Sequence, residues 1–254
     1  MLRTRVMPCL LLRNRGLVKT TGFKNPRYVG DPINTVRIFN EKEVDELIFL
    51  DITATVERRK PQFDLLEDIA SECFMPVAYG GGVRELADMQ TLFGLGVEKI
   101  AINSFTAEDL TFLRRAADQF GSQSVIGSMD VKRKRLGGYE VLTHGGRQRT
   151  RLDPVRYATQ LATHGTGEIL LTSIDRDGTM AGYDLELLRQ VTNAVNIPVI
   201  ACGGAGELAD LGRAVHEGDA AAVAAGSLFV YQGKQRGVLI NFPTKAELRL
   251  VLEH

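Results

Sequence analysis

The sequence predicts an α/β fold, namely a (β/α)8 TIM barrel with a twofold internal half-barrel repeat. Three blocks in the first half of the chain recur in the second half, and each block lies 122 residues from its copy. Short apolar runs alternate with amphipathic segments, which is typical of strand-then-helix units around a parallel sheet. Eight such units in 254 residues match this barrel in number and length.

The repeat also predicts the domain organisation. The paired blocks are 46–51 with 168–173, 76–82 with 198–204, and 85–88 with 207–210. Three matches in the same order indicate an ancestral half that was doubled and fused. We therefore expect a single domain over residues 1–254, with half-barrels at about 1–120 and 121–254. An open, doubly wound sheet is the alternative, but an even repeat closes more naturally into a barrel.

Apolar runs predict the eight strands, and each strand is expected to precede a helix. The strands are expected at 6–12, 47–51, 77–79, 99–102, 124–130, 169–173, 199–202 and 221–225. Capping residues predict where helices begin and end, because they satisfy backbone groups that a helix leaves unpaired. The start signals are Asp31-Pro32, Asp153-Pro154 and a capping box of Thr244 with Glu247, and the stop signals are Gly121 and Gly165.

Charge and composition exclude several classes of function. Lys and Arg total 31, as do Asp and Glu, so the chain lacks the basic excess of a nucleic-acid binder. No apolar run approaches the roughly 18 residues of a membrane span, and no signal peptide is evident, so we expect a cytoplasmic protein. Cys9, Cys73 and Cys202 lack the spacing of metal ligands and are expected to be buried thiols. Neither a metal nor a cofactor is predicted.

Glycine-rich turns after four strands are candidate phosphate sites. Barrel active sites lie at the carboxyl ends of the strands, where glycine allows close approach of a ligand and a helix N-terminus favours an anion. Glycine pairs also form simple tight turns, but their occurrence on adjacent strands in both halves favours a ligand with two phosphates. The candidates are Gly81, Gly82, Asn103 and Ser104, then Gly203, Gly204, Gly226 and Ser227, together with Gly178 in the loop 172–179.

Two aspartates at the predicted mouth are candidates for acid–base chemistry. Asp130 ends the fifth strand, where a carboxyl group faces a bound ligand. Asp177 lies in a loop that is rich in acids and hydroxyl groups. A turn or helix cap is the alternative role for such residues. Asp175 could brace the loop in place of Asp177, and spacing alone leaves that choice open.

Several motifs resemble HisF, the cyclase subunit family of imidazole glycerol phosphate synthase. The resemblance covers nearly the whole chain and rests on the segments 5–9, 49–53, 80–83, 143–146, 170–179 and 203–206. It implies an ammonia-dependent synthase of the lyase class within a glutamine amidotransferase complex. In that family, a HisH glutaminase docks on the amino-end face, and ammonia passes along the barrel axis. The ammonia then closes an imidazole ring on a bisphosphorylated substrate.

One position departs from the family pattern. The family uses two aspartates, at the ends of strands one and five, and Asp130 matches the second of them. Leu11 occupies the first, and a leucine side chain cannot transfer a proton. If both acids are needed, the loss would be on the order of 10² to 10⁴ in rate. Lys19, in a long first loop expected from Arg13 to Gly30, matches a lysine of a mobile lid, with a solvated surface charge as the alternative.

The route for ammonia matches the family. Arg5, Glu46, Lys99 and Glu168 correspond to its ring of charges at the bottom of the barrel, which forms a gate. Four charges inside a barrel are tolerable only if they pair, so a purely structural ring is the alternative. Glu98 matches an acid that contacts the glutaminase. The resemblance thus implies a heterodimer with a HisH-type glutaminase and a phosphorylated small-molecule ligand.

Loss of one acid beside a retained gate indicates a duplicate with another ammonia acceptor. The chain resembles in particular the HisF paralogues of surface-polysaccharide gene clusters, which share the three leucines of strand one and a tail like residues 238–243. These paralogues are associated with an asparagine-synthetase-like amidotransferase and convert an acetamido group of a lipopolysaccharide (O-antigen) sugar into an acetamidino group. A true cyclase subunit of histidine biosynthesis and a non-catalytic ammonia conduit remain as alternatives.

Overall fold

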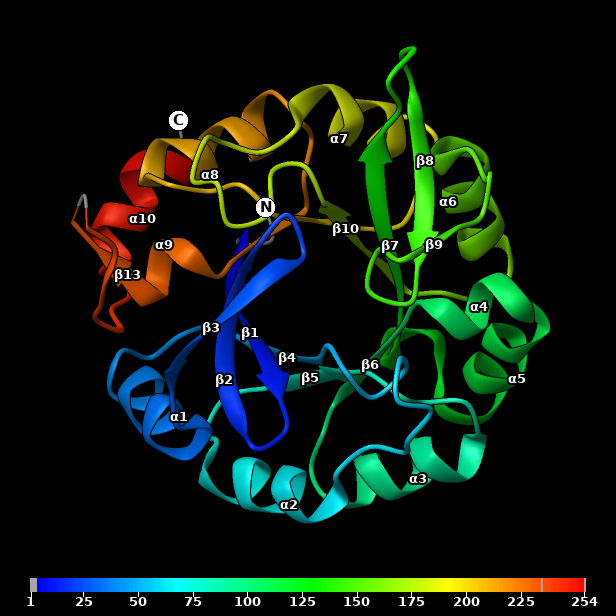
Figure 1. The fold of residues 1–254 in the computed structure, drawn as a ribbon, viewed down its shortest axis with the longest axis horizontal. Coiled ribbons are helices and arrows are strands. Elements are labelled where there is room, and N and C mark those ends of the chain that lie inside the picture. Colours follow the sequence, from blue (N-terminus) through cyan, green and yellow to red (C-terminus); the bar gives the residue numbers. More distant parts are fainter. Residues whose placement is uncertain (1–3, 234, 254) are drawn as a thin grey trace.

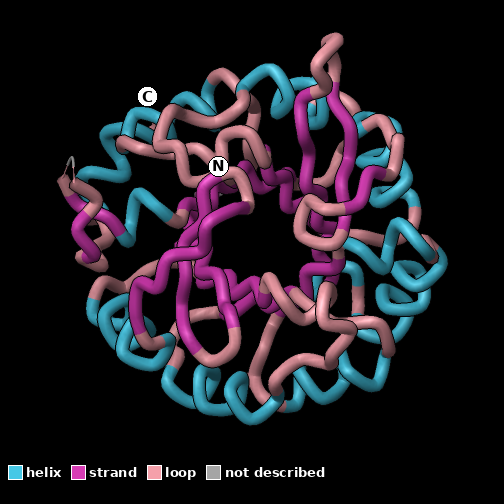
Figure 2. The backbone as a smooth tube through the Cα atoms, viewed as in Figure 1, coloured by secondary structure: helices cyan, strands magenta, loops and turns pink. Residues whose placement is uncertain are grey.

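Eight parallel strands close into a barrel in the computed structural model, which describes residues 4–233 and 235–253 (Figure 1, Figure 2). Around the ring the strands are β1 (Arg5–Arg13), β4 (Leu47–Asp51), β5 (Val77–Gly80), β6 (Lys99–Ile102), β7 (Val125–Arg133), β10 (Glu168–Ser173), β11 (Val199–Cys202) and β12 (Ala222–Ala225). Pairing of β12 with β1, and of β7 with β10, closes the ring. The predicted barrel is therefore confirmed, and the open sheet is excluded.

The helices form an outer ring around the strands (Figure 1). They are α1 (Pro32–Glu41), α2 (Phe63–Glu72), α3 (Leu86–Gly94), α4 (Ser104–Glu108), α5 (Thr111–Phe120), α6 (Pro154–Thr163), α7 (Leu185–Thr192), α8 (Leu208–His216), α9 (Ser227–Val230) and α10 (Lys245–Leu252). Within 4–233 and 235–253, no helix combines the length and apolar character that crossing a bilayer requires.

The capping predictions are confirmed at atomic detail. The Asp31 carboxylate accepts a hydrogen bond from the backbone N–H of Asn34, and Asp153 does the same for the first turn of α6. Thr244 and Glu247 form the predicted capping box at the start of α10. These contacts satisfy N–H groups that have no partner inside a helix.

The first loop was predicted wrongly, because residues 13–30 form a β-hairpin over the mouth. Its strands are β2 (Gly16–Thr21), which pairs with the upper part of β1, and β3 (Lys24–Gly30), which pairs with β2. The sequence hid β3 because most of its side chains are exposed and polar, so it lacks the apolar alternation of a half-buried strand. We call residues 16–30 the lid hairpin.

A second excursion extends the barrel strand β7 above the mouth. The chain continues to Arg133, turns, and returns as β8 (Tyr139–Thr143), which pairs with β7 and with β9 (Gln148–Arg149). The tip of this hairpin projects beyond the ring of helices (Figure 1). A short hairpin of β13 (Tyr231–Gln232) and β14 (Gly237–Val238) follows α9.

Alternation along β1 separates two environments. Val6, Leu10 and Leu12 belong to the large core between the strands and the helices. Arg5, Met7, Cys9 and Leu11 instead face the barrel axis, since successive side chains of a strand point to opposite faces. From bottom to top, the axis therefore passes a charged residue, an apolar residue, a thiol and the leucine at the mouth.

Candidate active site at the barrel mouth

A cavity of about 450 Å³ opens at the carboxyl ends of the strands, and all eight barrel strands contribute to its lining. This size fits a small phosphorylated ligand. The cavity brings together the predicted site residues from both halves of the chain. Those that line it are Leu11, Lys19, Gly81, Gly82, Asn103, Ser104, Asp130, Asp177, Gly178, Gly203, Gly204, Gly226 and Ser227.

The two glycine pairs occupy backbone conformations and spaces that other residues cannot use. Gly81 and Gly203 have φ values of 128° and 87°, and the φ values of their partners Gly82 and Gly204 are also positive. A Cβ on Gly204 would lie 2.2 Å from the carbonyl oxygen of Gly182, and one on Gly81 would lie 2.6 Å from that of Asp51. The pairs therefore serve tight turns, and they also leave the cavity wall free of side chains.

The hydroxyl groups beside the glycines differ between the two halves. In the first half, the Ser104 hydroxyl oxygen accepts a hydrogen bond of 2.9 Å from the backbone N–H of His144. In the second half, the buried Ser227 hydroxyl has no hydrogen-bond partner among the residues that the structure describes. A buried hydroxyl without a partner is costly, and an oxygen of a bound phosphate would supply one.

Asp130 has the properties of a proton-transfer group at neutral pH. Its carboxyl group is surrounded by protein atoms of the barrel. The side chain also lines the cavity, so part of its surface is exposed there. This burial raises the pKa of Asp130 to about 7, and the nearby charge of Asp177 adds to the effect. A hydrogen bond from Asn103 opposes the shift. Both protonation states are thus populated near pH 7, as general acid–base catalysis requires.

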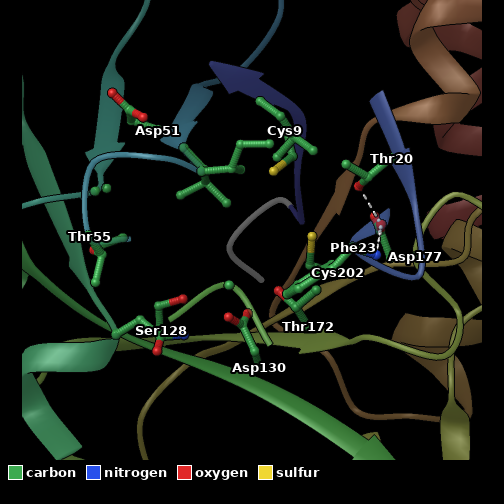
Figure 3. Close-up of a pocket in the computed structure, with 18 of the residues that line it drawn as sticks. Cys9, Thr20, Phe23, Asp51, Thr55, Ser128, Asp130, Thr172, Asp177 and Cys202 are labelled. Carbon is green, nitrogen blue, oxygen red and sulfur yellow. Dashed lines mark hydrogen bonds between the residues drawn. The ribbon is translucent and has the colours of Figure 1, made fainter. Parts of the chain in front are cut away.

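The lid hairpin holds Asp177 in place (Figure 3). The Thr20 hydroxyl donates a hydrogen bond of 2.7 Å to Oδ2 of Asp177, and the N–H of Phe23 donates to the same oxygen at 3.3 Å. The neighbouring Asp175 is exposed, and its carboxylate accepts from the backbone N–H of Arg133 at 2.7 Å. Asp175 therefore braces the loop, while Asp177 lies in the cavity wall.

Lys19 points from the lid hairpin into the cavity, and only 5% of its surface is exposed. A Cβ on Gly226 would lie 1.9 Å from the Lys19 Nζ, so the lysine fills the space that this glycine leaves. Within the described part of the chain, no carboxylate lies within ion-pair distance of it. The interpretation of Lys19 as a solvated surface charge is therefore wrong, and its ammonium group lies beside Gly226, the glycine that follows β12.

Leu11 lies in the wall of the same cavity as Asp130, with 8% of its surface exposed. Asp51 is the last residue of the neighbouring strand β4. The Arg59 Nη2 donates hydrogen bonds of 2.7 and 2.8 Å to its two carboxylate oxygens. Asp51 also accepts hydrogen bonds from the backbone N–H groups of Thr53 and Ala54. Asp51 therefore holds its own loop together and does not replace an acid at position 11.

The four predicted gate residues form a closed ring of alternating charge at the bottom of the barrel. Arg5 binds Glu46 at 2.6 Å and Glu168 at 2.8 Å. The Lys99 Nζ lies 3.2 Å from Glu46 and 3.4 Å from Glu168. Its contact with Oε1 of Glu46 is an ion pair that lacks hydrogen-bond geometry. Burial alone would lower the pKa of Arg5, but the two glutamates outweigh it and raise that pKa. Glu98 is exposed next to this ring.

Some features of the mouth were not predicted. Cys9 and Cys202 lie side by side in the cavity wall, while Cys73, expected to be buried, is only half-buried. Residues 132–151, which form the excursion above β7, contain seven Lys or Arg residues and one acid, Glu140. The alternation of β1 could have placed Cys9 on the axis, but no sequence signal pairs it with Cys202.

Comparison with known proteins identifies one family. Residues 5–236 match the family described as "Histidine biosynthesis protein". The chain is 52% identical over 243 residues to "Putative imidazole glycerol phosphate synthase subunit hisF2" of Pseudomonas aeruginosa, covering 96% of this chain and 97% of the relative. It is 42% identical to "Putative imidazole glycerol phosphate synthase subunit hisF3" of Vibrio vulnificus, covering 100% of this chain and 98% of that relative. "Imidazole glycerol phosphate synthase subunit HisF" of Alkaliphilus metalliredigens is 45% identical, and the match covers 91% of this chain and 92% of that relative.

Proposed function

This chain belongs to the histidine biosynthesis protein family and is of the HisF type, and from that premise we propose that it is the barrel subunit of a glutamine-dependent amidotransferase complex. It receives ammonia from a HisH-type glutaminase and delivers it to an acceptor other than the histidine-pathway substrate. That acceptor is an acetamido sugar of a surface polysaccharide, which becomes an acetamidino sugar. The observation that carries this proposal is Leu11 in the cavity wall with Asp130, above a complete charged ring.

The lower barrel supports the role of an ammonia conduit. The charged ring has no unpaired member, so it can exist in a barrel interior at a tolerable cost. Above it, the axis is lined by apolar side chains such as Met7, Ile48 and Leu170. Neutral ammonia enters such a lining more readily than ammonium, because burial of an unpaired charge is costly. We assign the face that bears Glu98 to the glutaminase.

The upper barrel supports binding with weak or absent ring closure. Leu11 cannot transfer a proton, and Asp177 is held as a hydrogen-bond acceptor by Thr20 and Phe23. Asp130 is the remaining acid of the pair that the family uses. Replacement of the acetamido oxygen by nitrogen also requires activation of that oxygen. We assign this activation to an asparagine-synthetase-like partner and the delivery of ammonia to this chain.

The basic excursion offers a docking surface for that partner. Ammonia that leaves the mouth is lost as ammonium unless the acceptor enzyme covers the mouth. Residues 132–151 stand beside the mouth with seven basic residues against one acid, and Leu136 at their tip is fully exposed. An acidic partner surface with an apolar pocket would complement them, since opposite potentials guide association and exposed apolar side chains anchor it.

Ring closure is the activity that tests the proposal. The purified chain is mixed with a HisH-type glutaminase, glutamine and the bisphosphorylated substrate of imidazole glycerol phosphate synthase, and glutamate and imidazole product are measured. We expect glutamine hydrolysis with ring closure on the order of 10² to 10⁴ slower than in a HisF subunit that has both acids. Leu11→Asp should raise ring closure, whereas Leu11→Asn, of similar shape but unable to transfer a proton, should not. Fast ring closure by the unaltered chain would overturn the proposal.

The second candidate is a working cyclase subunit of histidine biosynthesis. The pKa of Asp130 near 7 and the glycine pairs in both halves favour it, since they suit proton transfer on a bisphosphorylated ligand. Fast ring closure that Asp130→Asn abolishes would select this candidate. A purely non-catalytic conduit would instead deliver ammonia equally well with Asp130→Asn.

We also propose that the whole chain is one domain of two half-barrels, at about 1–120 and 121–254. The two glutamates of the charged ring, Glu46 and Glu168, occupy equivalent positions of the repeat. The halves meet at the β6–β7 and β12–β1 pairings. Halves produced separately should therefore unfold cooperatively only after they are mixed, as measured by circular dichroism during heating.

A further inference from the structure

Two thiols form a contact at the floor of the mouth. Cys9 on β1 and Cys202 on β11 are free, neighbouring thiols, and 3% and 8% of their surfaces are exposed. Both line the cavity, and their sulfur atoms point into the same space (Figure 3). Since β12 lies between β1 and β11, the pair follows the barrel rule that alternate strands contribute to one layer.

This separation of strands disfavours a disulfide bond. Neighbouring strands lie about 4.8 Å apart, so strands separated by one other strand are about 9 Å apart. A disulfide requires Cα atoms within about 7 Å unless the backbone moves. The two sulfur atoms therefore meet as a pair of unbridged thiols in the folded barrel.

Lys19 supplies a positive charge to this pair. A Cβ on Gly226 would meet both the Lys19 Nζ, at 1.9 Å, and the carbonyl oxygen of Cys9, at 2.9 Å, so the ammonium group lies close to the backbone of Cys9. The neighbouring Cys202 thiol is the main cause that lowers the pKa of Cys9, and Lys19 also lowers it. Burial and the charges of Asp177 and Asp130 oppose this shift without cancelling it. The pKa of Cys202 is raised well above its ordinary value, first by the neighbouring Cys9 thiol and then by burial, so Cys202 stays protonated.

We propose that Cys9 is an oxidation site, at which a small hydroperoxide such as hydrogen peroxide converts the thiolate to a sulfenic acid. The sulfur attacks one peroxide oxygen, so an S–O bond forms while the O–O bond breaks. Sulfur loses two electrons to the peroxide. The departing hydroxide takes a proton from the Lys19 ammonium and leaves as water, and Lys19 regains its proton from solvent. A neutral peroxide of nearly the size of water enters the cavity without a charge penalty.

Oxidation at this position would interrupt the barrel axis. Cys9 lies between Met7, in the apolar lining, and Leu11, at the mouth. A polar oxygen atom added there narrows the passage that neutral ammonia would use. This consequence depends on the proposed conduit function, whereas the oxidation itself does not.

Cys73 provides a matched control within the same chain. It is more exposed than Cys9, and burial raises the pKa of its thiol to about 12, with the charge of Glu72 as a second cause. Exposure alone therefore predicts that Cys73 reacts first, because access limits the attack. Thiolate character predicts the opposite order.

Sulfenic acid trapping distinguishes these two orders. The full chain is treated with hydrogen peroxide at neutral pH in the presence of dimedone, and labelling of each cysteine is followed over time by mass spectrometry. We expect Cys9 to be labelled at least tenfold faster than Cys73. Lys19→Met should slow labelling of Cys9 about tenfold without affecting Cys73, and Lys19→Arg should retain most of the rate. Faster labelling of Cys73, or a rate for Cys9 that is equal in Lys19→Met and Lys19→Arg, would overturn the proposal.

A second measurement separates the oxidation site from the conduit. Glutamine hydrolysis and ammonia transfer are measured with the HisH-type partner before and after peroxide treatment. We expect oxidation to lower transfer while hydrolysis continues, and transfer by Cys9→Ser to be insensitive to peroxide. If labelling favours Cys9 but the reduced chain transfers no ammonia, the conduit function is wrong and the oxidation site stands.

Discussion

The hydroxyl group of Thr20 donates a 2.7 Å hydrogen bond to the carboxylate of Asp177, which joins the lid hairpin to the loop after β10. Both residues are buried, and the backbone reinforces the contact, since the N–H of Gly22 donates to the Asp177 carbonyl oxygen at 2.9 Å. The lid hairpin is thus tied to this loop partly by a side chain that faces the cavity. Whatever frees the Asp177 carboxylate also weakens this link.

Removal of this hydroxyl should loosen the lid. We expect Thr20→Val to cost about 1 to 3 kcal/mol of lid stability, because a buried carboxylate loses a donor, and Thr20→Ser to cost much less. The exposed residues Lys24 and Arg27 of the lid make trypsin a suitable probe. Cleavage after these residues should be at least fivefold faster in Thr20→Val than in Thr20→Ser. Equal cleavage of the two variants would show that the hydrogen bond does not control the lid.

The raised pKa of Asp130 should make stability depend on pH with a defined sign. Its folded-state pKa of about 7 exceeds the ordinary carboxyl value, so the folded state binds the proton more tightly than the unfolded state does. This contribution is present in full below about pH 4 and is lost as the pH rises towards 7. Because the side chain has access to the cavity, we expect a loss on the order of 2 kcal/mol. The difference in unfolding free energy between the wild type and Asp130→Asn, measured in urea from pH 4 to 8, should fall over that range; a flat difference would contradict the assignment.

The charged ring should respond strongly to the loss of one member. Glu46 has 3% of its side chain exposed and serves both Arg5 and Lys99. Glu46→Gln leaves two cations without full compensation, which costs about 3 to 5 kcal/mol in buried pairs. Arg15→Gln, which breaks an exposed ion pair with Asp64, is the control and should leave the unfolding free energy unchanged within error. If urea unfolding gives similar values for both variants, the ring is not a buried network.

Local patterns in the sequence were sufficient for the barrel and for a set of site residues that lie together in one cavity. The apolar run of β6 was predicted with its correct ends, since a buried parallel strand is marked by composition alone. The lid hairpin was missed because its exposed strand β3 is stabilised by pairing with β2 and carries no apolar pattern. The choice between Asp175 and Asp177 depended on which carboxylate meets Arg133 and which meets Thr20, and spacing carries no such information. The same holds for the contact of Cys9 with Cys202.

Gly204 tests whether the glycine pairs are required for the turn as well as for a ligand. Its φ is 124°, and an added Cβ would lie 2.2 Å from the carbonyl oxygen of Gly182, so Gly204→Ala forces the backbone to move. We expect a loss of about 1 to 3 kcal/mol of stability and at least tenfold weaker binding of inorganic phosphate in calorimetry. Gly94→Ala, at the end of α3, is the matched control because nothing lies within 4 Å of its added Cβ. That variant should be unchanged or up to about 1 kcal/mol more stable. Equal phosphate binding by Gly204→Ala and the wild type would restrict this glycine pair to a structural role.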